Sequence, residues 1–427
     1  MDRRRFLQTA TASGLGLALG PSAWRHLLSA TPGDGPYGPL GPPSGGTTGL
    51  RLPEGFTHRV IAESMQPVEG APLLGPWHVS PDGAATFPLD DGGWVYVCNS
   101  EAPLIGGVNA LRFDAEGNVV GGYPILRSTS QNCAGGTTPW GTWLSCEEYD
   151  FTAEGGPAGM VWECDPSGPG QGLPRPALGR FNHEAVAVDP TRHHLYLTED
   201  DGDGLLYRFT PDAWRDDGMG VLDSGVLEAA AVDQGDVTWH EVPDPSGVTG
   251  PTREQVPAAT VFDGGEGCWY DSDTVYVATK GDRRVWALDV EDVDHPTIEV
   301  IYDATPVGPD LETAVKVDNV TVSPWGDVFV AEDSSDRKRM LLLSENNGTY
   351  DASTFLEVIE AAPGSELTGP VFDPSGTRMF FSSQRGASIR DGEKVVAEEA
   401  GLPSPFDSVL THRGITYEVT GPFGLLD

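Results

Sequence analysis

A short unit recurs along the chain and restricts its fold more than any other feature of the sequence. Each copy reads as an apolar strand, a turn such as Asp-Pro or Ser-Pro, a second apolar strand and a polar, mostly acidic tip. The clearest copy runs from His183 to Asp201, and another runs from Asp318 to Asp333. Runs such as Leu-Tyr-Leu and Val-Phe-Val are typical of strands covered on both faces. Such units must stack on neighbours to bury those faces.

Six copies can be recognised, and they begin roughly 45–80 residues apart, against about 40–50 residues for one propeller blade. The 55 glycines and 36 prolines punctuate the apolar runs, as expected for short strands joined by turns. We therefore predict an all-β fold, a six-bladed β-propeller in a single domain with small insertions. The longest interval leaves room for an insertion around residues 211–258.

The N-terminal segment predicts export. Arg3, Arg4 and Arg5 precede Phe6-Leu7, which resembles a twin-arginine (Tat) signal, and a mild apolar stretch follows over residues 10–23. That stretch is too short and weak to span about 30 Å of hydrocarbon. We predict a Tat signal peptide over 1–30, a flexible linker over 31–50 and a propeller catalytic domain over 51–427. The Tat translocon would be a partner during export to the periplasm or the medium; an uncleaved anchor and a plain basic tail are the alternatives.

The net charge of -38 argues against nucleic acid and anionic membranes as partners. Two causes of this charge remain open: the hydrated carboxylate surface of a halophilic protein, and a load of bound cations. The five cysteines form no CxxC pair, and their odd number leaves at least one thiol unpaired. We expect a monomer without stable membrane association.

Propeller topology predicts where the polar residues meet. The start of the first strand and the end of the antiparallel second strand of each blade lie at the same mouth of the central channel. The strand starts supply Glu184, Glu266, Asp318 and Asn319. The strand ends supply Asn99, Glu101, Cys146, Glu147, Glu148, Glu199, Asp200, Asp201, Lys280, Asp282, Glu332, Asp333, Gln384 and Arg385.

So many acids at one rim would repel one another. Two unit charges 4 Å apart cost about 4 kcal/mol at an effective dielectric near 20, and bound cations would remove that cost. Oxygen ligands suit Ca²⁺, whereas a thiolate favours a transition metal. The predicted metal ligands are Cys146, Glu147, Glu148, Glu184, Glu199, Asp200, Asp201, Glu266, Asp318, Asn319, Glu332 and Asp333. The alternatives are a buried, inert Cys146 and acids that only form solvated turns.

The run from Thr138 to Glu148 (TPWGTWLSCEE), together with Asn182-His183-Glu184-Ala185 and the Tat-like start, resembles the PhoX-type alkaline phosphatases. The resemblance spans most of residues 50–420. It implies a six-bladed propeller with Ca²⁺ and with Fe³⁺ joined through a bridging oxo group. It also implies an iron-bound cysteine, matched here by Cys146, with Glu184 and Glu266 on iron. A mix of metals would be held by Glu148, Glu199, Asp318 and Glu332.

These features together predict an exported metal-dependent phosphoester hydrolase that acts on a small-molecule phosphoester. Lys280 and Arg385 would be catalytic, by stabilising charge on the phosphoryl oxygens. No GxSxG, HExxH or phosphate-binding glycine loop is present in the sequence. Two other interpretations are a calcium-dependent propeller lactonase or related hydrolase, and a non-enzymatic binding propeller stabilised by calcium.

Overall fold

A computed structural model describes residues 35–45, 49–148, 159–215, 217–304, 316–333, 338–346, 349–359, 365–388 and 412–424. Within these ranges the regular structure is almost entirely β-strand, with two short 3-10 turns, η2 (Pro176–Leu178) and η3 (Thr252–Glu254). The prediction of an all-β fold is confirmed. Within the same ranges, no helix has the length and apolar character that a membrane crossing requires. The predicted signal peptide lies outside the described residues.

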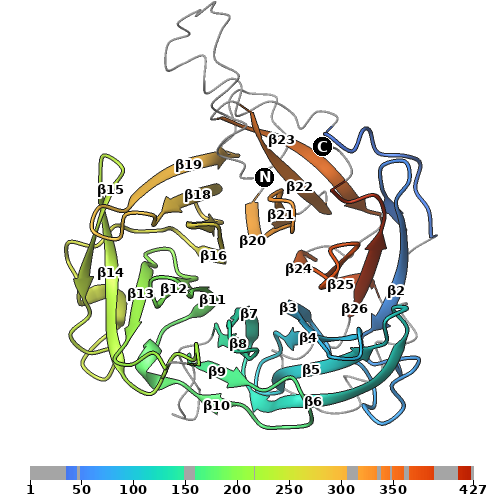
Figure 1. The fold of residues 1–427 in the computed structure, drawn as a ribbon, viewed down its shortest axis with the longest axis horizontal. Coiled ribbons are helices and arrows are strands. Elements are labelled where there is room, and N and C mark those ends of the chain that lie inside the picture. The colour runs from blue at the N-terminus through green and yellow to red at the C-terminus, as the bar shows by residue number, and fades with distance from the viewer. Residues whose placement is uncertain are drawn as a thin grey trace, which may run out of the picture.

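The strands form five antiparallel sheets arranged around a common centre (Figure 1). The first sheet contains β3 (Pro81–Pro88), β4 (Trp94–Ser100), β5 (Gly106–Phe113) and β6 (Val119–Thr129). The second contains β7 (Asn132–Thr137), β8 (Trp143–Glu147), β9 (Val161–Cys164) and β10 (Leu173–Pro174).

The next sheet has nine strands. Its first part runs outward through β11 (His183–Asp189), β12 (His194–Glu199), β13 (Leu206–Pro211), β14 (Gly225–Asp233) and β15 (Asp236–Glu241). Its second part returns inward through β19 (Thr297–Asp303), β18 (Arg284–Asp289), β17 (Thr274–Thr279) and β16 (Gly265–Asp271). One residue pair, Asp236 with Thr297, joins the two parts.

The last two sheets complete the ring. One contains β20 (Lys316–Val322), β21 (Val328–Asp333), β22 (Lys338–Asn346), β23 (Thr349–Val358) and β1 (Leu50–Arg51). The other contains β24 (Leu367–Phe372), β25 (Arg378–Ser388), β26 (His412–Thr420) and β2 (Thr57–Glu63). Strands β1 and β2, early in the chain, thus form the outer edges of two sheets made from its C-terminal part, which ties the ring together.

The arrangement is propeller-like, but its hydrogen bonding does not give the six separate blades that we predicted. It gives four sheets of four or five strands and one sheet of nine. The difference arises in the predicted insertion at 211–258, where β15 adds an extra strand beside β14 and reaches β19. The innermost strands contact one another around the ring in the order β3, β7, β11, β16, β20, β24 and back to β3.

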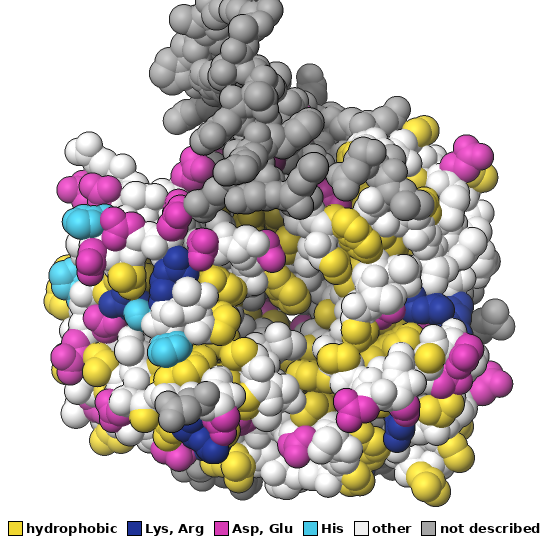
Figure 2. Space-filling model, viewed as in Figure 1, with side chains coloured by type: hydrophobic (Ala, Val, Ile, Leu, Met, Phe, Trp, Pro, Cys, Tyr) yellow, Lys and Arg dark blue, Asp and Glu magenta, His cyan; other side chains and the backbone are white. Residues whose placement is uncertain are grey.

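The hydrophobic core lies between neighbouring sheets rather than at the centre of the ring. One cluster, for example, joins Phe329 of β21 to Phe381 of β25 and to Phe56. Tyr37 also packs edge-on against Phe56 and Phe355, so this part of the segment predicted as a linker contacts the propeller. Figure 2 shows one face of the ring, where hydrophobic side chains gather around the centre and acidic ones are spread toward the rim.

Candidate metal centre

The innermost strand of each sheet or half-sheet begins with a β-bulge. In the pair β3–β4, for example, the register breaks between Pro81 and Ala84, so that Asp82 and Gly83 lack partners in the ladder. The same break occurs in β7, β11, β16, β20 and β24. A bulge changes the direction in which a side chain points, and bulges are frequent next to active sites. The first residues of these bulges are Asp82, Cys133, Glu184, Glu266, Asp318 and Gly369.

The second residue of most bulges is small, which lets the inner strands approach closely. A Cβ atom on Gly83 would lie 2.5 Å from the Cα of Ala134 on the next inner strand. A Cβ on Gly267 would lie 2.5 Å from the backbone nitrogen of Val320. These second residues line a central cavity of about 90 Å³. The close approach of the strands brings the first residues of the bulges together at one mouth.

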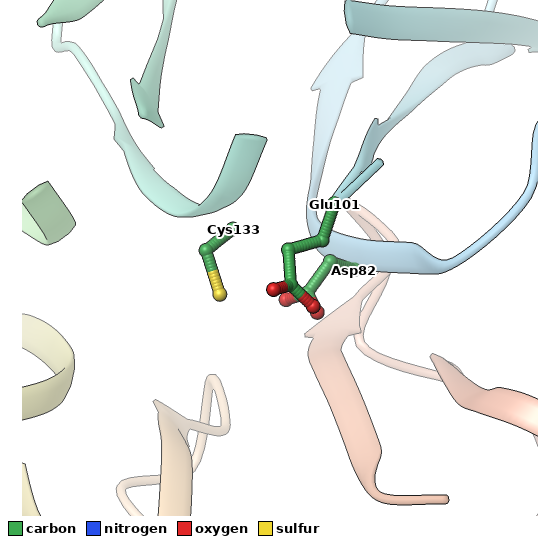
Figure 3. A group of neighbouring side chains, drawn as sticks. All are labelled: Asp82, Glu101 and Cys133. Atoms are coloured by element: carbon green, nitrogen blue, oxygen red, sulfur yellow. The ribbon is translucent and has the colours of Figure 1, made fainter. Parts of the chain in front are cut away.

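Five bulge residues and two strand-end acids form three overlapping groups with the spacing of metal sites. The first group is Asp82, Glu101 and Cys133 (Figure 3). The second is Cys133, Glu148 and Glu184, and the third is Glu184, Glu266 and Asp318. Within each group the possible ligand atoms all lie within 4.8 Å of one another. Cys133 and Glu184 each belong to two groups, so the three sites are continuous.

The surroundings of these groups disfavour negative charge. Burial, and then the charge of Glu366, raise the pKa of Asp82 to about 8. Burial and the charge of Asp82 raise the pKa of Glu101 to about 8 as well. Burial is also the main cause that places the pKa of Glu148, Glu184, Glu266 and Asp318 well above the usual value for a carboxyl group. Bound cations would reverse these shifts.

Glu184 fits a cation most clearly. Its side chain is 1 % exposed, and neither carboxylate oxygen has a hydrogen-bond partner among the described residues. A buried carboxylate without partners is costly, and such groups are usually paired or bound to a metal. Acids of the second and third groups surround it, since Glu266, Glu148 and Asp318 all raise its pKa. The donor set of carboxylates and one thiol therefore fits metal ions.

Two cations and one amide of the chain border the centre. The Nζ atom of Lys280 lies 2.6 Å from Oε1 of Glu266 and also contacts Asp200. The charge of Arg385 lowers the pKa of Glu366, which burial and Asp333 nevertheless raise to about 7. Gln384 donates from its Nε2 atom to Asp82 (2.8 Å) and to Glu101.

A family model for alkaline phosphatase PhoX matches residues 106–386, about two thirds of the chain. The chain belongs to the PhoX family. The match covers the inner strands from β7 to β24, and with them most of the three metal-ligand groups. No curated protein sequence matches the chain.

Several solved structures are similar to this PhoX-family chain at low sequence identity. A gluconolactonase from Xanthomonas campestris is 13 % identical with a TM-score of 0.43, over 90 % of this chain and 98 % of that one. The periplasmic gluconolactonase PpgL of Pseudomonas aeruginosa is 12 % identical with a TM-score of 0.45, over 79 % and 85 %. The calcium-binding protein regucalcin from Agrobacterium tumefaciens is 14 % identical with a TM-score of 0.43, over 86 % and 96 %. Similarity at this level carries no argument about function.

Several residues that the sequence placed at the mouth do lie there in the PhoX-family structure. Glu148, Glu184, Glu266 and Asp318 belong to the second and third groups. Among their neighbours, Asn319 donates from Nδ2 to Asp318 over 2.7 Å. Four more predicted residues either contact members of the centre or Glu366, or affect their pKa values through charge. They are Asp200, Lys280, Asp333 and Arg385.

Cys146 lies elsewhere. It is fully buried in an apolar cluster with Leu144, Val161 and Val186, and burial raises its pKa well above the usual value. Along β8, Leu144 and Cys146 share the apolar face. The cysteine that lies among the carboxylates is Cys133, on the neighbouring strand β7. The thiol expected at the mouth is therefore supplied by a different residue.

Four predicted acids are already satisfied by other partners, away from the three groups. Glu147 accepts hydrogen bonds from the backbone nitrogens of Ser130 and Met160. Arg253 pairs with Glu199 (3.1 Å) and with Asp201 (2.9 Å). Arg339 pairs with Glu332 through two nitrogen atoms, at 2.6 and 2.8 Å. These hydrogen bonds and ion pairs leave the four carboxylates little capacity to bind a metal.

Asp82, Cys133 and Glu366 are not among the residues predicted from the sequence, and Glu101 was predicted at the mouth but not as a ligand. The Ser80-Pro81-Asp82-Gly83 run has the composition of a turn, whereas β3 already begins at Pro81. Cys133 precedes the Gly-Gly-Thr-Thr-Pro run at 135–139, which also reads as a turn, although β7 begins at Asn132. A signal was nevertheless present, because four of the five bulge ligands are followed by Gly or Ala: Asp82-Gly83, Cys133-Ala134, Glu184-Ala185 and Glu266-Gly267.

Proposed function

We propose that this PhoX-family chain is an exported phosphoric monoester hydrolase that uses Fe³⁺ and Ca²⁺ at the channel mouth. The observation that carries the proposal is the continuity of the three groups, which are linked by Cys133 and Glu184. A row of buried acids with raised pKa values gains most from bound cations. The family description, alkaline phosphatase, supplies the reaction class.

The donor atoms favour a division of the metals. The first and second groups contain the Cys133 thiol, and soft sulfur favours iron over calcium. The third group offers only carboxylate oxygens, which suit Ca²⁺. We therefore propose that Cys133, in place of Cys146, would supply the thiolate ligand, and that Glu184 would supply a carboxylate to both the second and the third group.

The chain's own residues would act by holding and orienting charge. Bound metal ions would neutralise the phosphate and make a water molecule a better nucleophile. Lys280 is held by Asp200 and Glu266 at the edge of the third group, where its ammonium group can face the phosphoryl oxygens. Arg385, beside Glu366, would supply a second positive charge. Gln384 would hold Asp82 and Glu101 in place through its amide.

We also infer that the nine-stranded sheet serves as two blades, which gives six in total, since its two parts share one residue pair. Export by the Tat route to the periplasm or the medium remains our proposal from the N-terminal sequence. That route carries folded proteins, so that the metal ions could be bound before export.

Purified native protein tests the proposal through its metal content and its turnover of an aryl phosphate. We expect the protein to contain both iron and calcium. We also expect it to hydrolyse the ester, and this activity should stop when chelators remove the metals. Calcium alone with turnover of a lactone would support a propeller lactonase instead. Calcium without turnover of either substrate would indicate a binding propeller.

A further inference from the structure

A cavity of about 260 Å³ lies in the sheet β3–β6, at the ends of its strands that face the metal centre. Ser100, one of its wall residues, pairs with Pro81 and directly precedes Glu101. Gly106, another wall residue, is so close to Asn132 that a Cβ atom there would lie 2.6 Å from Asn132 Oδ1. Pro81, Ser100 and Asn132 immediately precede Asp82, Glu101 and Cys133, the three members of the first group. Ser100 belongs to the cavity wall, and Pro81 and Asn132 contact it. The cavity and the first group are therefore neighbours.

One side of the wall of this cavity is apolar, the rest is polar and includes Arg127, and no described lining residue is negatively charged. The apolar side contains Leu104 and Ile105, which are 62 % and 52 % exposed, and the buried residues Val108 and Leu126. None of the described residues that line the cavity is acidic, although the chain has 64 Asp and Glu residues. Burial lowers the pKa of His78 to about 3, so its ring is neutral at physiological pH. An anionic ester would meet little repulsion here.

The backbone around the cavity is strained. Leu104 has φ 61° and Ser128 has φ 62°, both in the left-handed region that large or non-glycine residues rarely adopt. Such a conformation costs on the order of 1–3 kcal/mol and is concentrated at ligand sites. At Leu104 it accompanies an apolar side chain that is largely open to solvent at the cavity wall. Leu104 and Ser128 thus hold two segments of the cavity wall in an uncommon backbone conformation.

We propose that the cavity binds the organic alcohol part of the phosphoester, with a preference for an aromatic ring over a short alkyl group. The proposal rests on the proposed function for the identity of the ester. A cavity of about 150 Å³ is large enough to hold benzene, so a volume of about 260 Å³ has room for a substituted ring. The phosphate, attached to that ring, would then lie toward the first group. Burial of the ring against Leu104 and Ile105 would add binding energy.

Ile105→Trp tests the proposal, because the larger side chain would fill the cavity from a half-exposed position. The ratio of kcat/KM for phenyl phosphate to that for methyl phosphate should fall at least about 10-fold. Val248→Trp is the matched control, since Val248 is 82 % exposed and lies outside the cavity. It should leave the ratio as in the wild type. Equal ratios in all three proteins would overturn the proposal.

A binding measurement separates this proposal from the proposed function. Phenol, titrated into the metal-loaded protein and followed by NMR, should bind saturably to wild type and at least about 10-fold more weakly to Ile105→Trp. Absence of saturable binding would overturn the cavity assignment even in an active phosphatase. Saturable binding in a protein that hydrolyses no phosphoester would contradict the proposed function alone.

Discussion

Cys133 and Cys146 are buried thiols on adjacent strands, and they provide a matched pair for testing the thiolate ligand. Cys133→Ser should remove most of the iron and lower kcat/KM at least about 100-fold, because a hydroxyl binds iron far more weakly than a thiolate. Cys146→Ser should retain iron and activity but lose about 1–3 kcal/mol of stability, because it buries a hydroxyl in an apolar cluster. Iron content and urea unfolding measure both effects. Iron loss from the Cys146 variant alone would contradict our assignment.

Glu184 should stabilise the metal-loaded protein and destabilise the metal-free one. Its carboxylate lacks hydrogen-bond partners among the described residues and lies among other acids. In EDTA at pH 9, Glu184→Gln should therefore unfold at a higher urea concentration than wild type. When it is purified without EDTA, the same variant should contain less metal than wild type. Glu54→Gln, at an exposed position, should change neither quantity. A metal-free Glu184→Gln protein less stable than wild type at that pH would show that the carboxylate has a partner.

The β-bulges make a prediction at the scale of the strands. In Gly267→Ala, the new Cβ atom would meet the backbone of Asn319 and Val320 at 2.5–2.9 Å. Strand β20 would have to move, and Asp318 with it, so we expect a loss of about 1–3 kcal/mol and weaker calcium binding. Gly168→Ala is the control, since nothing lies within 4 Å of its Cβ position. Calorimetric calcium titration and thermal unfolding of both variants test this; equal behaviour would contradict the close strand packing.

The same bulges explain how far the sequence predicts the site. That strand starts and strand ends meet at one mouth follows from antiparallel pairing alone, so Glu148, Glu184, Glu266 and Asp318 could be found. Which residue of a strand faces the mouth depends on the bulge, which breaks simple alternation. On β8, alternation without a bulge turns Cys146 into the core. On β7, the bulge turns Cys133 to the mouth, and no periodic pattern in the sequence marks it.

For the whole molecule, the repeated unit predicts an all-β ring, because stacking is the only way for such units to bury both faces. It does not predict how the strands divide into sheets. The single pair between Asp236 and Thr297 decides whether β11–β15 and β16–β19 are one sheet or two. A contact of that kind depends on the length and path of the β14–β15 hairpin, which the repeat does not encode.

The metal-free ring should lose stability as the pH rises. In the folded state the pKa is about 8 for Asp82 and Glu101 and about 7 for Glu366, against about 4 in the unfolded chain. Between these values the folded state binds more protons, so the free energy of unfolding falls with pH. In EDTA, the free energy of unfolding measured with urea should be a few kcal/mol lower at pH 9 than at pH 6. Added Ca²⁺ should restore most of the loss; a metal-free protein equally stable at both pH values would contradict the buried acidic centre.

Diffraction from crystals of the native protein, measured on both sides of the iron absorption edge, tests the central claim most directly. We predict an iron-specific anomalous peak within bonding distance of Cys133 Sγ, with Glu184 joining that site to a calcium site at Glu266 and Asp318. An iron peak bound to Cys146, or active crystals with no iron peak near Cys133, would contradict the account.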